Sequence, residues 1–233
     1  MTKSIRSLGH AGFIITTPEG KTVIIDACID GNPLCPLKLQ DIREAHLALV
    51  THYHWDHALS AVAIARQTQA IVVAQTDAVK KFQVEMGLPP EKTVFDGKGM
   101  NIGGSFSYAG ITVTMTQAAH SSVTGSPCGY LIKLEDGCTI YHAGDTGIFE
   151  SMRLLGEIYP IDLALLPIGG VFTMDSFQAV KALGLLKPKK AIPMHYKTFA
   201  VMEQSADNFL KLARREFPQI EVIVLEAGEE YRW

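Results

Sequence analysis

The chain has 233 residues, of which 47% are hydrophobic and only 19% are charged, and its formal net charge is −3. Disordered chains combine low hydrophobicity with high net charge, so this composition excludes disorder and predicts a buried core. Without a basic excess the chain has no electrostatic attraction to nucleic acid or to an anionic membrane, so we expect neither as a partner.

Short strands and helices alternate in the first third of the chain. Residues 4–8, 13–16 and 22–26 are rich in β-branched and apolar side chains between turn residues, which predicts three strands. The wholly apolar run 47–50 predicts a strand buried on both faces, and 70–74 predicts another. Apolar residues at helical spacing predict helices over 57–69 and 76–86.

The middle of the chain is β-rich, with strands predicted over 93–95, 105–108, 111–116, 130–134 and 139–142. No charged residue occurs from Gly99 to Ile132, which raises the question of a membrane span. A spanning helix needs about 20 predominantly apolar residues. Glycine, serine and threonine interrupt this run throughout, so short strands and turns are favoured.

The last third alternates again, with helices predicted over 149–158, 175–186 and 205–217 and strands over 163–166, 191–193 and 221–225. No linker-like segment divides the chain, so one domain over residues 1–233 is favoured. Strand meanders combined with βα units predict an α/β fold with two β-sheets and helices packed outside them. No apolar signal segment follows the first charges, so we expect a cytoplasmic protein; a homo-oligomer remains open.

Metal-binding residue types cluster in the block from His52 to His57, directly after the strand at 47–50. His52 and His54 are two residues apart, so in extended backbone they point to one side and can share a metal ion. Asp56 and His57 follow where the helix begins and aim at a neighbouring point. Four ligands on one zinc would leave no open position for chemistry, whereas two ions about 3.5–4 Å apart would activate water.

Three further candidates lie just beyond predicted strands. His120 follows the strand at 111–116, Asp145 follows the strand at 139–142, and His195 follows the strand at 191–193. Taken singly, each could be a structural residue. We expect them to be metal ligands because the block alone leaves a dinuclear site incomplete. We expect His46 and His142 to be structural, and Asp26 to accept a hydrogen bond from a ligand rather than bind metal.

These residues, in this order along nearly the whole chain, resemble the metallo-β-lactamase superfamily. The resemblance implies a four-layer αβ/βα sandwich, with two mixed β-sheets and helices on the outer faces, and a dinuclear metal site. It also implies that His52, His54 and His120 hold the first metal, that Asp56, His57 and His195 hold the second, and that Asp145 bridges them. Nitrogen and oxygen ligands suit two divalent ions, with zinc expected and manganese or iron as alternatives.

Stretches 8–13, 141–147 and 167–174 are similar to a family of uncharacterised metal-dependent hydrolases. That family is related to L-ascorbate-6-phosphate lactonase and to the phospholipase D that cleaves N-acyl phosphatidylethanolamines. Relatives often have small residues between the histidines, whereas this chain has Tyr53 and Trp55. His10, in the first stretch, is a candidate catalytic donor to the attacked oxygen; a loop-stabilising role is the alternative.

The function predicted is hydrolysis by a metal-bridging hydroxide, with Asp56 orienting it and carrying its proton to the leaving group. The expected substrate is a small intracellular ester, lactone or phosphorylated metabolite. A phosphodiesterase or nuclease on the same site is the main alternative. A diiron redox centre, which favours a carboxylate at position 54, and a non-catalytic metal-binding module rank lower.

Overall fold

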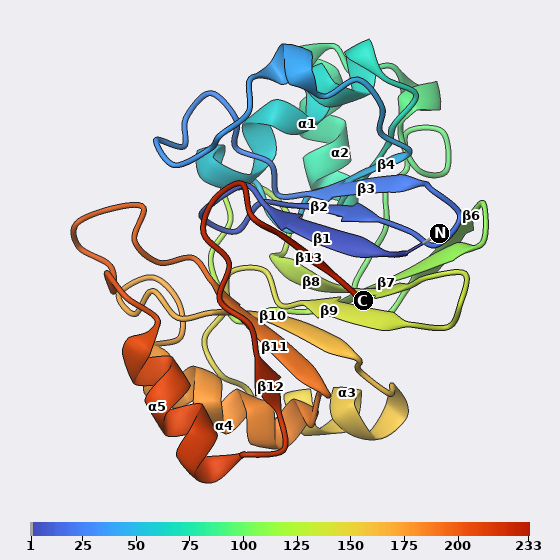
Figure 1. Cartoon of the computed structure of the whole chain (residues 1–233). Coiled ribbons are helices and arrows are strands. Elements are labelled where there is room, and N and C mark those ends of the chain that lie inside the picture. Colours follow the sequence, from blue (N-terminus) through green and yellow to red (C-terminus); the bar gives the residue numbers. More distant parts are fainter. Residues whose placement is uncertain (1) are drawn as a thin grey trace.

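Two mixed β-sheets lie face to face at the centre of the computed structural model, which describes residues 2–233 (Figure 1). The first sheet has the order β13-β1-β2-β3-β4-β5, with strands Glu230–Arg232, Ser4–Ser7, Phe13–Thr16, Thr22–Ile25, Leu47–Leu49 and Ile71–Val73. The second has the order β12-β11-β10-β9-β8-β7-β6, with strands Glu221–Val222, Lys190–Met194, Leu163–Pro167, Thr139–His142, Cys128–Lys133, Ile111–Gln117 and Ser105–Tyr108.

Five α-helices cover the outer faces of the two sheets. Helices α1 (Trp55–Gln67) and α2 (Thr76–Met86) lie on the first sheet (Figure 1). Helices α3 (Met152–Ile158), α4 (Ser176–Leu186) and α5 (Asp207–Glu216) lie on the second. This arrangement confirms the predicted four-layer sandwich. Within residues 2–233, no helix has the length and apolar character needed to cross a membrane.

The alternation of side chains along β3 shows how the layers are held together. Val23 and Ile25 face the larger apolar cluster, which fills the space between the sheets and beneath α3, α4 and α5. Ile24 faces the smaller cluster, which packs α1 and α2 on the first sheet. Successive side chains of a strand point to opposite faces, so the consecutive apolar residues 23–25 are explained by cover on both faces of this central strand.

The predicted strand at 93–95 is wrong. Thr93 forms an isolated bridge to Val72, but Phe95 and Asp96 have φ angles of 55° and 50°, which end any extended structure. The predicted strand at 221–225 is shorter than expected, because only Glu221 and Val222 pair with β11. Strand β13 is absent from the prediction; it pairs antiparallel with β1, more than 220 residues earlier in the chain.

A buried tyrosine joins the two sheets by hydrogen bonds. The Tyr130 hydroxyl on β8 lies 2.8 Å from the Val50 carbonyl oxygen and 3.1 Å from the Val73 carbonyl oxygen. Replacement by phenylalanine (Tyr130→Phe) leaves the buried Val50 carbonyl without this donor, so the free energy of unfolding should fall by about 1–3 kcal/mol. Urea unfolding measures this, and Tyr108→Phe, on the partly exposed edge strand β6, is the control. An unchanged midpoint for Tyr130→Phe would contradict the prediction.

Candidate metal centre

The predicted ligands meet because their strands end at facing edges of the two sheets. Strand β1 is antiparallel to β2, which is antiparallel to β3, and β3 is parallel to β4, so β1, β3 and β4 end at one edge. By the same reasoning β7, β9 and β11 end at one edge of the second sheet. The polar residues that follow these six strands are His10, Asp26, the block 52–57, His120, Asp145 and His195.

The first group of facing ligand atoms comes from His52, His54 and His120, the three residues predicted for the first metal. Their ring nitrogens lie within 4.8 Å of one another. His52 Nε2 lies 2.9 Å from His54 Nδ1, and the His52 and His120 ring centroids lie 5.1 Å apart. Three imidazole nitrogens that converge on one point match the ligand set of a catalytic zinc ion, which keeps a further position open.

The second group contains Asp56, His57 and His195, the residues predicted for the second metal, together with His10. One ligand atom from each of the four lies within 4.8 Å of the others. His10 Nε2 lies 3.1 Å from Asp56 Oδ2, while His10 Nδ1 lies 3.0 Å from the Thr198 hydroxyl. The His10 imidazole is therefore directed at Asp56, and it is held in that orientation from its other side.

Asp145 lies between the two groups. Its Oδ2 atom is 2.9 Å from His195 Nε2, 3.4 Å from His57 Nε2 and 3.7 Å from His120 Nε2, so one carboxylate oxygen faces both groups. Asp145 Oδ1 and His57 Nε2 are buried and have no hydrogen-bond partner among residues 2–233. Buried polar atoms without a partner are costly, and metal coordination satisfies them; the donor set therefore fits divalent cations.

The pKa values of the buried residues agree with a cation site. Burial lowers the pKa of His52 to about 3 and that of His10 to about 4, so both imidazoles are neutral near pH 7 and offer a lone pair. Burial alone would raise the pKa of Asp145, but the adjacent His57 and His195 hold it well below its usual range. The ionised carboxylate is thus stabilised by these imidazoles, and a divalent cation would supply the positive charge in their place.

A layer of hydrogen bonds orients His57 from behind. Asp26 Oδ2 accepts a hydrogen bond from His57 Nδ1 at 2.8 Å and from the Thr51 hydroxyl at 2.6 Å. Asp26 Oδ1 accepts from the Thr51 backbone N–H at 2.8 Å. With Nδ1 donating to Asp26, Nε2 is the His57 atom left to face the site, and this is the common arrangement for a metal-ligating histidine, whose metal-bound nitrogen has given up its proton.

Replacing Asp26 by asparagine (Asp26→Asn) should weaken metal affinity by about 10–100-fold, because His57 loses the carboxylate that fixes its tautomer and orientation. Competition with a chromogenic chelator measures the affinity. The matched control is Asp175→Asn, since Asp175 caps α4 through the Gln178 N–H and asparagine caps a helix equally well. Equal metal affinity in the two variants would show that His57 does not depend on Asp26.

The two histidines predicted to be structural have protein partners away from the groups. His142 Nε2 donates to the Ala11 carbonyl at 2.9 Å, and its Nδ1 accepts from the Gly144 N–H at 3.1 Å. His46 Nδ1 accepts from the Thr22 N–H at 3.1 Å. The remaining six of the eight histidines belong to the two groups.

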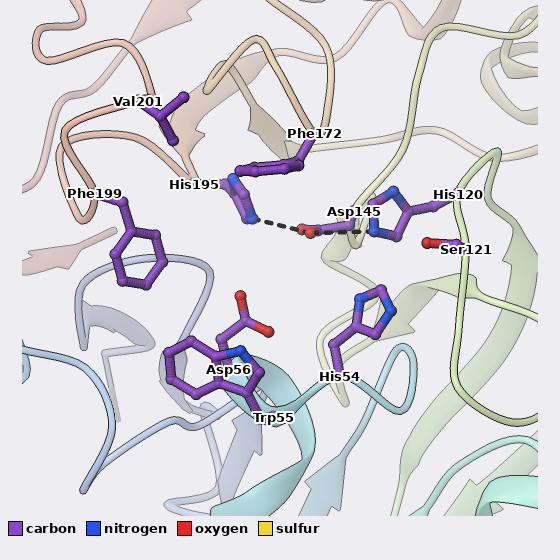
Figure 2. A pocket seen from close by; sticks show the side chains of 10 residues that line it. All are labelled: His54, Trp55, Asp56, His120, Ser121, Asp145, Phe172, His195, Phe199 and Val201. Carbon is purple, nitrogen blue, oxygen red and sulfur yellow. Dashed lines mark ion pairs between the residues drawn. The ribbon is translucent and has the colours of Figure 1, made fainter.

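A cavity of about 510 Å³ opens onto the centre. Figure 2 shows five of the predicted ligands around it, namely His54, Asp56, His120, Asp145 and His195. The other lining residues are Trp55, Ser121, Phe172, Phe199 and Val201, which sequence reasoning did not assign to the site. For two of these five residues the sequence did contain a hint: Trp55 stands between the candidate ligands, and Phe172 lies in the stretch 167–174, which is similar to the hydrolase family.

Comparisons with known proteins agree with this geometry. A model of the beta-lactamase superfamily domain matches residues 21–196. A UPF0173 metal-dependent hydrolase of Nitratidesulfovibrio vulgaris is 47% identical over 223 residues, which cover 95% of this chain and 91% of that protein. Another, from Thermococcus kodakarensis, is 43% identical, covering 97% of each. A metallo hydrolase from the archaeon Ignicoccus hospitalis has a similar structure, with a TM-score of 0.88, 33% identity, and coverage of 100% of this chain and 99% of its own.

Proposed function

The chain belongs to the metallo-β-lactamase superfamily, and from this premise we propose that it hydrolyses a small molecule with two divalent metal ions held at the centre described above. The protein is a metal-dependent hydrolase, as its relatives are. What we propose beyond this is the number of metal ions, the residues that bind them and the class of substrate.

The position of Asp145 carries the dinuclear assignment. One oxygen of this carboxylate faces His120 of the first group and His57 and His195 of the second, at 3.7, 3.4 and 2.9 Å. A carboxylate shared by two ligand groups is suited to bridging two ions. We therefore assign the first ion to His52, His54 and His120, the second to Asp56, His57 and His195, and the bridge to Asp145. Zinc is the metal proposed, with manganese or iron as alternatives.

Two ions at these positions would lower the pKa of a water molecule toward about 7 and polarise the oxygen of the attacked group. Asp56 lines the cavity, where its carboxylate can orient that water and carry its proton to the leaving group. His10 Nε2 is directed at Asp56, so the role we propose for His10 is to position the Asp56 carboxylate for the reaction.

The proposed substrate is a small ester, lactone or phosphorylated compound. A net charge of −3 and a cavity without a lysine or arginine in its lining offer no binding surface for a polyanionic backbone. These observations favour a small molecule over nucleic acid, the alternative that the sequence left open.

Elemental analysis joined to a substrate panel tests the proposal. Protein loaded with zinc, manganese or iron is expected to hold two ions per chain and to hydrolyse at least one lactone, carboxylic ester, phosphodiester or amide. A chelator should abolish turnover, and added metal should restore it. His120→Ala and His195→Ala should each lower the metal content by one ion, whereas the control His46→Ala should not. Saturation at a single ion, or loss of both ions from either variant, would overturn the dinuclear assignment.

A further inference from the structure

Four apolar side chains are among those that line the cavity opening onto the metal centre (Figure 2). We call this set the apolar rim, and its members are Trp55, Phe172, Phe199 and Val201. Trp55 begins α1, Phe172 lies on the loop between β10 and α4, and the other two lie on the loop between β11 and α5. Three separate segments of the chain thus contribute to it.

The rim is far more exposed than the apolar side chains of the core. Trp55, Phe172 and Val201 are 49%, 55% and 57% exposed. The Trp55 and Phe199 ring centroids lie 6.0 Å apart, so the two rings border the same space. Apolar surface that gathers at a cavity beside a few polar groups is typical of a small-molecule site, and about 510 Å³ falls within the usual volume range.

Positive charge is missing from the cavity wall. No lysine or arginine is among the residues that line it, within the described residues 2–233. The two loops that carry the rim contain one cationic residue, Lys197, and its Nζ pairs with Glu226 at 2.7 Å. Apart from the proposed ligands, the lining offers polar hydrogen-bonding atoms from Ser121 and from the Trp55 indole.

An anionic group on the substrate, distant from the reacting centre, would lose part of its hydration against these half-exposed side chains without gaining a counter-charge. An aliphatic or aromatic substituent would instead gain by leaving water against the rim. The two loops therefore discriminate between the substrate classes that the metal chemistry alone admits.

We propose that the substrate is an uncharged carboxylic ester or lactone whose non-reacting substituent is aliphatic or aromatic and packs against the apolar rim. The proposal rests on the proposed function and excludes the phosphorylated compounds that the metal centre alone would allow. In the reaction, the water oxygen forms a bond to the carbonyl carbon and the bond from that carbon to the leaving oxygen breaks. One water proton passes to the leaving oxygen, and an acid and an alcohol result from an open ester, or a single hydroxy acid from a lactone.

Two esters with the same leaving group test the charge preference. Para-nitrophenyl hexanoate and mono-para-nitrophenyl adipate have acyl chains of equal length, but the second ends in a carboxylate. The zinc-loaded wild-type protein is expected to hydrolyse the hexanoate with a kcat/KM at least about 10-fold higher. Equal values, or a preference for the adipate, would overturn the inference while the proposed function stands.

A pair of phenylalanine variants tests the rim itself. Phe172→Ala is expected to raise KM for the hexanoate by about 10-fold and KM for the short para-nitrophenyl acetate by less, because the longer acyl chain loses more apolar contact with the rim. Phe177→Ala is the matched control, since Phe177 is 54% exposed on α4 and does not line the cavity. Equal effects of the two variants would overturn the assignment of the rim as the substituent site.

Binding of stable ethers separates this inference from the proposed function. Hexyl para-nitrophenyl ether and the matching ether with a terminal carboxylate cannot be hydrolysed by this chemistry, and calorimetry measures their affinities directly. Tighter binding of the uncharged ether that is lost in Phe172→Ala supports the rim even if no compound of the substrate panel is turned over, in which case the proposed function fails alone. Equal binding of the two ethers, or binding that Phe172→Ala leaves unchanged, overturns the inference.

Discussion

Replacing Asp56 by asparagine (Asp56→Asn) is expected to lower kcat by about 10²–10⁴-fold, the range for loss of a positioned acid–base group. Asparagine keeps the size of the side chain and an oxygen that can bind metal, but its amide cannot accept the proton of the attacking water. His10 Nε2 lies 3.1 Å from Asp56 Oδ2, so His10→Gln should give a smaller loss in kcat, through poorer positioning of the carboxylate. Rates are measured at saturating metal, with metal content determined on the same samples.

The matched control is Asp77→Asn. Asp56 and Asp77 each lie in the first turn of a helix, α1 and α2, so both substitutions remove the same favourable interaction with a helix N-terminus. Only Asp56 lines the cavity. If Asp56→Asn holds both ions and turns over at the wild-type rate, its assigned role in proton transfer is wrong.

Adding one methyl group at Gly169 (Gly169→Ala) should reduce kcat/KM by at least about 100-fold, because misplacing a site residue by about 1 Å can cost that much. A Cβ atom there would lie 2.1 Å from the His195 carbonyl oxygen and 3.0 Å from His195 Nδ1. The His195 backbone must then move, although its N–H donates to the His10 carbonyl at 2.8 Å. The variant should therefore hold the second ion weakly, whereas the first ion should remain.

Gly147→Ala is the matched control for this substitution. A Cβ atom at Gly147, two residues after Asp145, would meet nothing closer than the Ala119 carbonyl oxygen at 3.8 Å, an ordinary contact. Metal content by elemental analysis, kcat/KM and the melting temperature are compared for both variants. A Gly169→Ala protein with wild-type metal content and activity would show that this close approach does not set the position of His195.

Local patterns in the sequence were sufficient for much of the secondary structure. Residues 13–16, 76–86, 105–108 and 139–142 have the bounds that apolar spacing and turn residues predicted. The failures involve partners far apart in the sequence. Strand β13 is held by β1 across the whole chain, and the strand predicted at 221–225 stops after two residues because its pairing with β11 ends there. A local sequence pattern predicts which residues suit a β-strand, but it does not predict whether another strand lies beside them to form the hydrogen bonds.

Strain at the site shows the same dependence on distant partners. His10, Asp26 and His195 have φ angles of 55°, 46° and 56°, a region that residues with a Cβ rarely adopt. The sequence does not predict these positive φ angles, because glycine, the residue that usually indicates them, does not occupy any of the three positions. Hydrogen bonds from other segments hold these residues, among them the His195 N–H donated to the His10 carbonyl.

The low charged fraction and the apolar content of the whole chain predicted a buried core. The types of residue and their spacing identified the candidate ligands. A two-residue spacing after a buried strand directs His52 and His54 to one side whatever the rest of the chain does. Only the tertiary structure decided which candidate ligands meet. Three strands of each sheet, β1, β3 and β4 in the first and β7, β9 and β11 in the second, run in the same direction. Their ends therefore lie at facing edges of the two sheets. The tertiary structure also directed His10 at Asp56 and gathered the apolar rim from three segments, because contacts between distant segments arise only when the two sheets pack together.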